Sequence, residues 1–173
     1  MRDRFVGDVG DFAKYGLLRG LCGFTDGVPH RNLSLAIVWY FVEDRGLSYR
    51  SDPDRFQACD AFLFDRLGRI FNGNRRTVQA IAGSDIFPAD KTVFFPDPVP
   101  TGRRRREDWL NLALAKTSGC DVVFLDPDNG LASEPFGEGH ISAKHAYYEE
   151  IEPFLRRGQS LVAWHSALAV CRA

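Results

Sequence analysis

Two apolar runs limit the fold of this chain more than any other feature of the sequence. The longest covers residues 35–42, and the second covers residues 122–125. Such runs, rich in β-branched and aromatic residues, are typical of strands buried on both faces of a parallel sheet. Segments with a helical pattern lie between them, so strands and helices alternate. The sequence therefore predicts an α/β fold with a three-layer, mainly parallel, Rossmann-like sheet.

The other elements follow from periodicity and turn residues. Helices are expected over residues 11–21, 53–73, 104–116 and 142–157. Further strands are expected over residues 77–81, 92–95 and 161–164. A chain of 173 residues has the size of one domain, so a single α/β domain over residues 1–173 is predicted. Because the chain stops soon after the last predicted strand, a sheet truncated at its C-terminal end is one interpretation.

Composition narrows the class of protein. The formal net charge is −1, so no overall field attracts the chain to nucleic acid. No apolar run reaches the roughly 18 residues that cross a bilayer, and no secretory signal is recognisable. Four scattered cysteines without a C-x-x-C pair indicate buried thiols rather than a zinc site or disulfides. We therefore expect a cytoplasmic protein without a membrane partner, with its oligomeric state open.

The second apolar run leads directly into Asp126-Pro127-Asp128-Asn129-Gly130. Pro127 lacks a backbone donor, and Asn129 and Gly130 tolerate positive φ, so the strand must end here. In open α/β sheets, ligands bind at the carboxyl ends of the strands. The loop is therefore a candidate site, and a turn whose side chains cap their own backbone is the alternative.

Two further acidic stretches are candidates for binding. Residues 5–19 contain two Gly-Asp pairs just before a predicted helix, where carboxylates are favoured by capping and by the helix dipole. Capping by Asp8 or Asp11 explains this block, but so does a site that a backbone must approach closely. Glu43 and Asp44 follow the long predicted strand, where nucleotide-binding folds place an acid on ribose hydroxyls. A solvated turn explains these two residues equally well.

Arg103, Arg104, Arg105 and Arg106 form the only basic run of the chain. Such a run can contact a phosphate backbone and add salt-dependent affinity without sequence readout. The alternative is the solvated start of a helix, partly neutralised by the two acids that follow. Nucleic acid is the partner that this run predicts.

Asp126 and Asp128 also fit a different class of enzyme. With Glu149 or Glu150 they could hold Mg²⁺, and Lys144 could lie near an attacking water, as in a metal-dependent hydrolase or nuclease. The usual acid-x-Lys spacing on one strand is absent. A non-catalytic binding domain on the same sheet is the third interpretation.

The N-terminal block and the acidic loop together resemble one family, the RlmJ-type ribosomal RNA adenine-N6 methyltransferases. Gly7, Asp11 and Lys14 match that family's His-Ala-Gly-Asn-x-x-Asp-Val-x-Lys-His pattern, and Asp8 is similar. Asp126-Pro127-Asp128-Asn129 stands where the family has Asp-Pro-Pro-Tyr, followed by a helix with Lys and Tyr and a strand with Trp. The chain also resembles an uncharacterised bacterial family with Gly-Asp-Val-Gly-Asp-Phe and Phe-Leu-Asp-Pro-Asp-Asn-Gly motifs.

The methyltransferase resemblance implies a role for each block. Asp126 and Pro127 would hold a base amine beside the methyl donor S-adenosylmethionine, although Asn129 replaces the aromatic residue on which a flipped base stacks. The expected function is an S-adenosylmethionine-dependent methyltransferase-like protein acting on a nucleic-acid base amine. The residues expected to bind the cofactor are Gly7, Asp8, Asp11, Lys14, Glu43 and Asp44, and those expected in catalysis are Asp126, Pro127, Asp128, Asn129 and Lys144.

Overall fold

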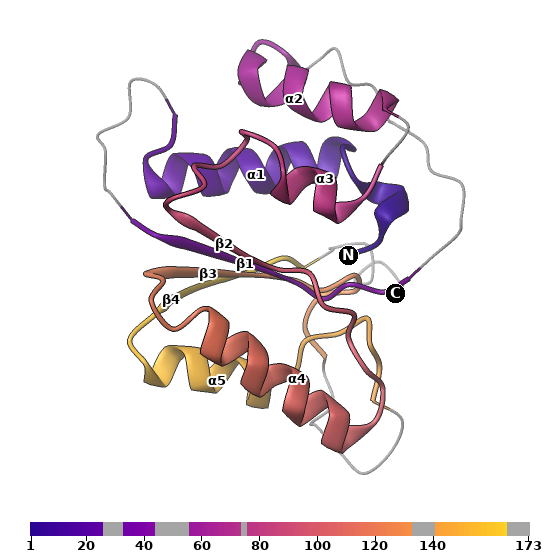
Figure 1. Ribbon diagram of the computed structural model, residues 1–173, viewed down its shortest axis with the longest axis vertical. Helices are drawn as coiled ribbons and strands as arrows, with labels where there is room; N and C mark the ends of the chain where they lie inside the picture. Colours follow the sequence, from indigo (N-terminus) through magenta and orange to yellow (C-terminus); the bar gives the residue numbers. More distant parts are fainter. Residues whose placement is uncertain (26–32, 44–55, 74–75, 133–140, 166–173) are drawn as a thin grey trace, which may run out of the picture. The chain divides into compact units, whose positions relative to one another are not determined.

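The computed structural model describes residues 1–25, 33–43, 56–73, 76–132 and 141–165. In this part of the chain, four parallel strands form one sheet in the order β2-β1-β3-β4 (Figure 1). The predicted α/β class and parallel sheet are therefore confirmed, whereas the Rossmann-like assignment stays a prediction. The strands are β1 (Leu35–Trp39), β2 (Thr92–Phe95), β3 (Val122–Asp126) and β4 (Ser160–Ala163).

The order of the strands creates a switch point in the middle of the sheet. β1 pairs with β3 in parallel, with Leu35 aligned to Val122 and Trp39 aligned to Asp126. β2 lies outside β1, and β4 lies outside β3, so successive strands are added in opposite directions from this central pair. In parallel α/β sheets the carboxyl ends of such a pair frame the ligand-binding crevice.

The described residues contain one short 3-10 helix and five α-helices. Asp8, Asp60 and Thr77 cap α1, α2 and α3, because each side chain accepts a hydrogen bond from a backbone N–H in the first turn. The predicted strand over residues 77–81 is therefore wrong: Thr77 starts a helix there. The helices are η1 (Asp3–Phe5), α1 (Val9–Cys22), α2 (Ala61–Asn72), α3 (Val78–Ala82), α4 (Arg103–Lys116) and α5 (Tyr148–Arg156).

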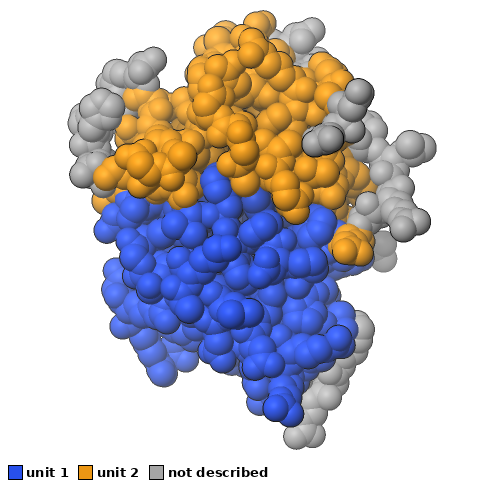
Figure 2. All heavy atoms as spheres, viewed as in Figure 1, with its two compact units in different colours: residues 1, 34–42, 93–173 blue, residues 2–33, 43–92 orange. Residues whose placement is uncertain are grey.

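The chain forms two compact units, which Figure 2 shows in different colours. Unit 1 consists of residues 1, 34–42 and 93–173 and holds nearly all of the sheet with α4 and α5. Unit 2 consists of residues 2–33 and 43–92 and holds α1, α2 and α3. Each unit is thus assembled from segments that are separated in the sequence.

Unit 1 has a core between one face of the sheet and its two helices. Figure 1 shows α4 and α5 along the same face of the sheet. Alternate strand residues such as Val38 and Val123 pack there against Trp109 of α4 and Phe154 of α5. Every residue of β1 and β3 is buried, as expected from their unbroken apolar runs.

Unit 2 is held together by aromatic contacts among its helices. The ring of Phe12 in α1 lies 6.4 Å from the ring of Phe64 in α2, in an edge-to-face arrangement. Tyr15, on the same helix, makes an edge-to-face contact with Phe87 at 5.5 Å. The high Phe content of the sequence therefore serves packing in this unit.

Several boundaries differ from the prediction or lie outside the described residues. α5 begins at Tyr148, not at residue 142, because the backbone of Lys144 and Ala146 bonds to the loop after β3 instead. The first part of the helix predicted over 53–73, most of the Gly-rich loop expected over residues 131–139 and the C-terminal tail from residue 166 lie outside the described residues. No helix in the described ranges is long and apolar enough to cross a membrane.

Candidate functional site

The acidic loop begins at the switch point of the sheet. Asp126 is the last residue of β3 and lies beside Trp39 of β1 in the strand register. Its side chain is 1% exposed and points to the face opposite α4 and α5, because its neighbour Leu125 packs in the core on their side. The Met1 amine donates to the carbonyl oxygens of Asp126, at 3.1 Å, and of Tyr40, at 2.8 Å. The carboxyl ends of the two central strands are thereby tied together.

The rest of the loop is held by a second stretch of backbone. Asn129 N–H donates to the carbonyl of Lys144 at 2.8 Å, and Ala146 N–H donates to the carbonyl of Gly130 at 3.1 Å. Pro127 is buried, Asp128 is half-buried and Asn129 is exposed. Asn129 is therefore accessible to solvent where β3 ends, beside the segment that carries Lys144.

Two histidines flank this loop. His165, which follows β4, accepts a hydrogen bond at Nδ1 from Leu131 N–H at 3.1 Å. Gly130 has φ +85°, and a Cβ placed on it would collide with the His165 ring. Only glycine thus allows the imidazole to approach the loop so closely.

His145 lies on the other side of the loop. Partial burial lowers the pKa of His145 from its ordinary value, and the nearby charge of Asp128 opposes this shift. The positive charges of Lys144 and Arg106 reinforce the lowering of this pKa, and the nearby His165 ring acts in the same direction. An acid, a lysine and two histidines are therefore close enough to interact at the end of β3. Sequence reasoning gave no role to the histidines; the signal available was that His165 directly follows a parallel strand.

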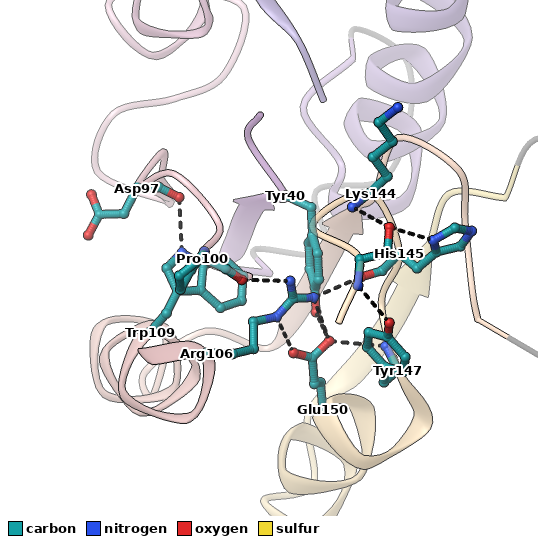
Figure 3. Close-up of polar contacts among 10 residues, drawn as sticks. Tyr40, Asp97, Pro100, Arg106, Trp109, Lys144, His145, Tyr147 and Glu150 are labelled. Atoms are coloured by element: carbon teal, nitrogen blue, oxygen red, sulfur yellow. Dashed lines mark hydrogen bonds and ion pairs between the residues drawn. The ribbon is translucent and has the colours of Figure 1, made fainter. Parts of the chain in front are cut away.

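Lys144 is not placed as predicted. It lies in a turn before α5, where its N–H donates to Ser142 Oγ at 3.2 Å, and His145 Nδ1 lies 3.0 Å from the same oxygen (Figure 3). The helix predicted over residues 142–157 was expected to include Lys144, and this is wrong, because α5 begins only at Tyr148.

The last arginine of the basic run is buried. Arg106 is 0% exposed and forms an ion pair with Glu150, at 2.5 Å from Nε to Oε1 and 3.0 Å from Nη2 to Oε2 (Figure 3). Arg106 Nη2 also donates to the carbonyl of His145 at 2.7 Å. The prediction that Arg106 contacts a partner is therefore corrected: its charge is used inside the fold. Arg103, Arg104 and Arg105 are exposed.

Tyr40 completes this buried cluster. Burial, followed by the charge of Glu150, raises the pKa of Tyr40 well above its ordinary value. The phenol therefore stays protonated and donates to Glu150 Oε2 at 3.3 Å. Tyr147 N–H donates to the same oxygen at 3.0 Å, so that Glu150 joins the end of β1 to the starts of α4 and α5. Glu150 is thus committed to structural contacts rather than to a metal.

The N-terminal block belongs to unit 2. Asp8 accepts from Asp11 N–H at 3.0 Å, and buried Asp11 accepts from Gly7 N–H at 2.9 Å. Lys14 Nζ lies 3.8 Å from Asp11 Oδ1. Gly7 has φ +81°, and a Cβ there would crowd the backbone of α2 at 3.0 Å. These contacts show the capping that the sequence allowed, and cofactor binding by this block stays a prediction.

Two candidate residues after β1 and the possible metal ligands remain. Glu43 is exposed, and Asp44 lies outside the described residues. Within the described ranges, no group of three or more His, Cys, Asp or Glu side chains could hold a metal ion. Searches for similar proteins found no family model, curated protein or solved structure that matches the chain.

Proposed function

We propose that the protein is an S-adenosylmethionine-dependent methyltransferase-like enzyme that acts on a nucleic-acid base amine at the Asp126–Asn129 loop. The observation that carries this proposal is the position of the loop. It leaves β3 at the switch point of a parallel sheet, next to the end of β1, where ligands of α/β sheets bind.

The residues of the loop suit an amine substrate. The carboxylate of Asp126 and the backbone carbonyl oxygens after it are acceptors, and an exocyclic amine has two N–H donors to satisfy. Asn129 is exposed and adds a side-chain carbonyl acceptor. Because the pKa of the neighbouring His145 is lowered, this imidazole is neutral at physiological pH and can accept the proton that the amine loses.

The exposed acid after β1 suits the ribose of the cofactor. S-adenosylmethionine would supply the electrophilic methyl group of its sulfonium to the amine nitrogen, and its sulfur would leave as the neutral thioether of S-adenosylhomocysteine. Glu43 follows the end of β1 and is exposed, so its carboxylate is available to ribose hydroxyls as in other α/β nucleotide sites. The resemblance of Gly7, Asp11 and Lys14 to the methyltransferase pattern points to the same cofactor.

A nucleic-acid substrate is supported by the start of α4. Arg106 bonds the carbonyl of His145, so the first turn of α4 lies against the segment that holds the loop. Arg103, Arg104 and Arg105 are exposed on that turn, and guanidinium groups there can contact phosphates beside the bound base.

Calorimetry with S-adenosylmethionine tests the cofactor, and methyl transfer to an adenine-containing RNA tests the reaction. We expect Asp126→Asn to abolish transfer while the variant stays folded, because the amide replaces one acceptor by a donor. Asp97→Asn is the matched control, since Asp97 is an exposed acid between two prolines of the same unit. Absence of heat with the donor would refute the methyltransferase, and binding without transfer would leave a non-catalytic binding domain.

The basic turn is tested separately. Replacement of Arg103, Arg104 and Arg105 by Gln should weaken RNA binding. On a single strand each phosphate contact adds roughly 0.7 to the magnitude of the slope of log affinity against log salt, so the loss of these arginines should lower that magnitude by about 2. An unchanged slope would mean that these arginines do not contact RNA, and it would leave the proposal for the Asp126–Asn129 loop unaffected.

A further inference from the structure

His165 follows β4 at the same edge of the sheet as the acidic loop. β4 and β3 are parallel, with Ala163 aligned to Leu125. Trp164 N–H donates to the carbonyl of Leu125 at 2.9 Å, which extends the pairing by one residue. The next residue, His165, therefore lies at the level where the Asp126–Asn129 loop leaves β3.

The ring edge of His165 that carries Nδ1 faces this loop. Leu131 N–H donates to Nδ1 at 3.1 Å. Gly130 puts no side chain between the loop and the ring, and Cγ, Nδ1 and Cε1 of His165 are the atoms that a Cβ there would meet first. Because Nε2 is bonded to Cε1, it lies at the end of this edge, beside the loop.

The bond from Leu131 determines which nitrogen of the neutral imidazole carries the proton. A backbone N–H can only donate, so Nδ1 must accept with its lone pair and cannot itself be protonated. The proton of the neutral ring is therefore on Nε2, which makes Nε2 a hydrogen-bond donor. His165 is exposed, and no acceptor for Nε2–H lies among the residues that the structure describes. The ring thus offers one donor to a ligand at the end of β3.

A donor at this place complements the acceptors of the loop. The amine of a base donates hydrogen bonds, whereas an unprotonated ring nitrogen that flanks the amine accepts one. Adenine has such a nitrogen on each side of its amine, at N1 and at N7. A base edge with an amine donor next to a nitrogen acceptor therefore needs acceptors and a donor side by side, as the loop and His165 provide them.

We propose that His165 is a binding residue of this site, and that its Nε2–H donates to the ring nitrogen that flanks the amine of the substrate base. This inference rests on the proposed function and narrows its substrate class to bases with a donor and an acceptor along one edge, such as adenine. The contact orients the amine and leaves the transfer of the methyl group to other residues.

Two amide variants separate the two hydrogen bonds of His165. In His165→Asn the side-chain oxygen can still accept from Leu131 N–H, but the amide is too short to reach the position of Nε2. In His165→Gln the amide nitrogen reaches that position and restores a donor. The probe is a uracil oligoribonucleotide with one central adenine, bound without S-adenosylmethionine and followed by fluorescence anisotropy. We expect about three- to tenfold weaker binding by His165→Asn, the usual effect of one neutral hydrogen bond, and near-parent binding by His165→Gln.

Deaza bases identify the atom that His165 contacts. In 1-deazaadenine and 7-deazaadenine one flanking nitrogen is replaced by C–H, and 3-deazaadenine, which loses a nitrogen remote from the amine, is the matched control. Either the 1-deaza or the 7-deaza base should weaken binding to the parent protein and leave binding to His165→Asn unchanged. Equal losses in parent and variant with every base would overturn the proposal. A nitrogen-15 spectrum with the proton of the neutral His165 ring on Nδ1 would overturn it as well.

The outcomes distinguish this contact from the proposed reaction. Weaker binding that depends on both His165 and one ring nitrogen, in a protein that transfers no methyl group, would support the contact and refute the reaction. Methyl transfer without that dependence would overturn the contact and leave the reaction standing. Failure of the parent protein to bind the adenine probe would overturn both.

Discussion

The charge of Arg106 is tolerated inside the protein because Glu150 lies against it. Both side chains are almost completely excluded from solvent, at 0% and 3% exposure. Removing a charge from water is costly, and only a close partner with further hydrogen bonds offsets that cost. Arg106 also lies over the rings of Tyr40, at 5.2 Å, and Trp109, at 5.4 Å, so the pair is enclosed by aromatic faces.

Glu150→Ala should therefore lower the free energy of unfolding by about 3–5 kcal/mol, because it leaves a buried, uncompensated guanidinium. Urea unfolding followed by circular dichroism measures the change. The double variant Arg106→Met/Glu150→Leu should recover most of the loss. Arg105→Met, at the exposed neighbour, should change stability by no more than about 0.5 kcal/mol. A small effect of Glu150→Ala would contradict the buried pair.

Gly130→Ala should destabilise the protein through both its backbone and a collision. Positive φ costs a non-glycine residue about 1–3 kcal/mol, and the added Cβ also displaces the His165 ring. Gly158→Ala is the matched control, since φ is +78° there and nothing lies within 4 Å of the added Cβ. Thermal unfolding should show Gly130→Ala as the more destabilised variant, and His165→Ala should reduce the difference. Equal effects would mean that His165 does not pack on the loop.

At the scale of single elements, the structure shows which local signals decide a fold. α3 is only five residues long, and its sequence Val-Gln-Ala-Ile-Ala suits a strand as well as a helix. What selects the helix is the Thr77 side chain, which accepts from Ala80 N–H at 3.3 Å, and the backbone N–H of Val78, which donates to Asp3 at 2.9 Å. The first signal is local, but the second connects residues far apart in the sequence.

Thr77→Ala should consequently lower the free energy of unfolding by about 1 kcal/mol, the usual cost of a lost N-cap. Thr77→Ser retains the hydroxyl acceptor and should stay within about 0.5 kcal/mol of the parent protein. Chemical denaturation resolves this difference. If the serine variant lost as much as the alanine variant, β-branching at this position would matter more than capping.

The strands and the acidic loop were predictable because their signals are local. Unbroken apolar runs gave β1 and β3, and Pro127 with Gly130 gave the end of β3. The buried role of Arg106 was also accessible, since Arg106, Trp109 and Ala113 follow a helical spacing on one face. The start of α5 was not predictable, because Lys144 and Ala146 pair with the loop after β3 through backbone contacts that periodicity does not report.

At the scale of the whole molecule, the two units are interleaved along the chain. β1 belongs to unit 1, yet segments of unit 2 precede and follow it. Every residue of β3 is aligned with a residue of β1, so the central pair of strands in unit 1 forms only when both of these distant segments are present. Stability of the sheet therefore depends on the whole chain rather than on its C-terminal half.

The fragment of residues 93–173 should accordingly fail to unfold cooperatively, because it exposes the edge of β3 and has lost half of the central pair. Circular dichroism during urea titration, with the full chain as control, tests this. A fragment with a sharp transition at the midpoint of the full chain would show that β1 is dispensable.

The place of β1 in the chain has a consequence during synthesis. On the ribosome, β1 emerges more than eighty residues before its partner β3, a delay of several seconds at about 5–20 residues per second. Although β2 emerges earlier and can pair with one edge of β1, the edge that pairs with β3 stays unfilled for that interval, and such an apolar edge is the kind of segment that chaperones bind and that aggregates form from. Substitution of a charged residue or proline within residues 35–39 would reduce this risk of aggregation but would also disrupt the sheet. The risk therefore follows from the order of the strands along the chain.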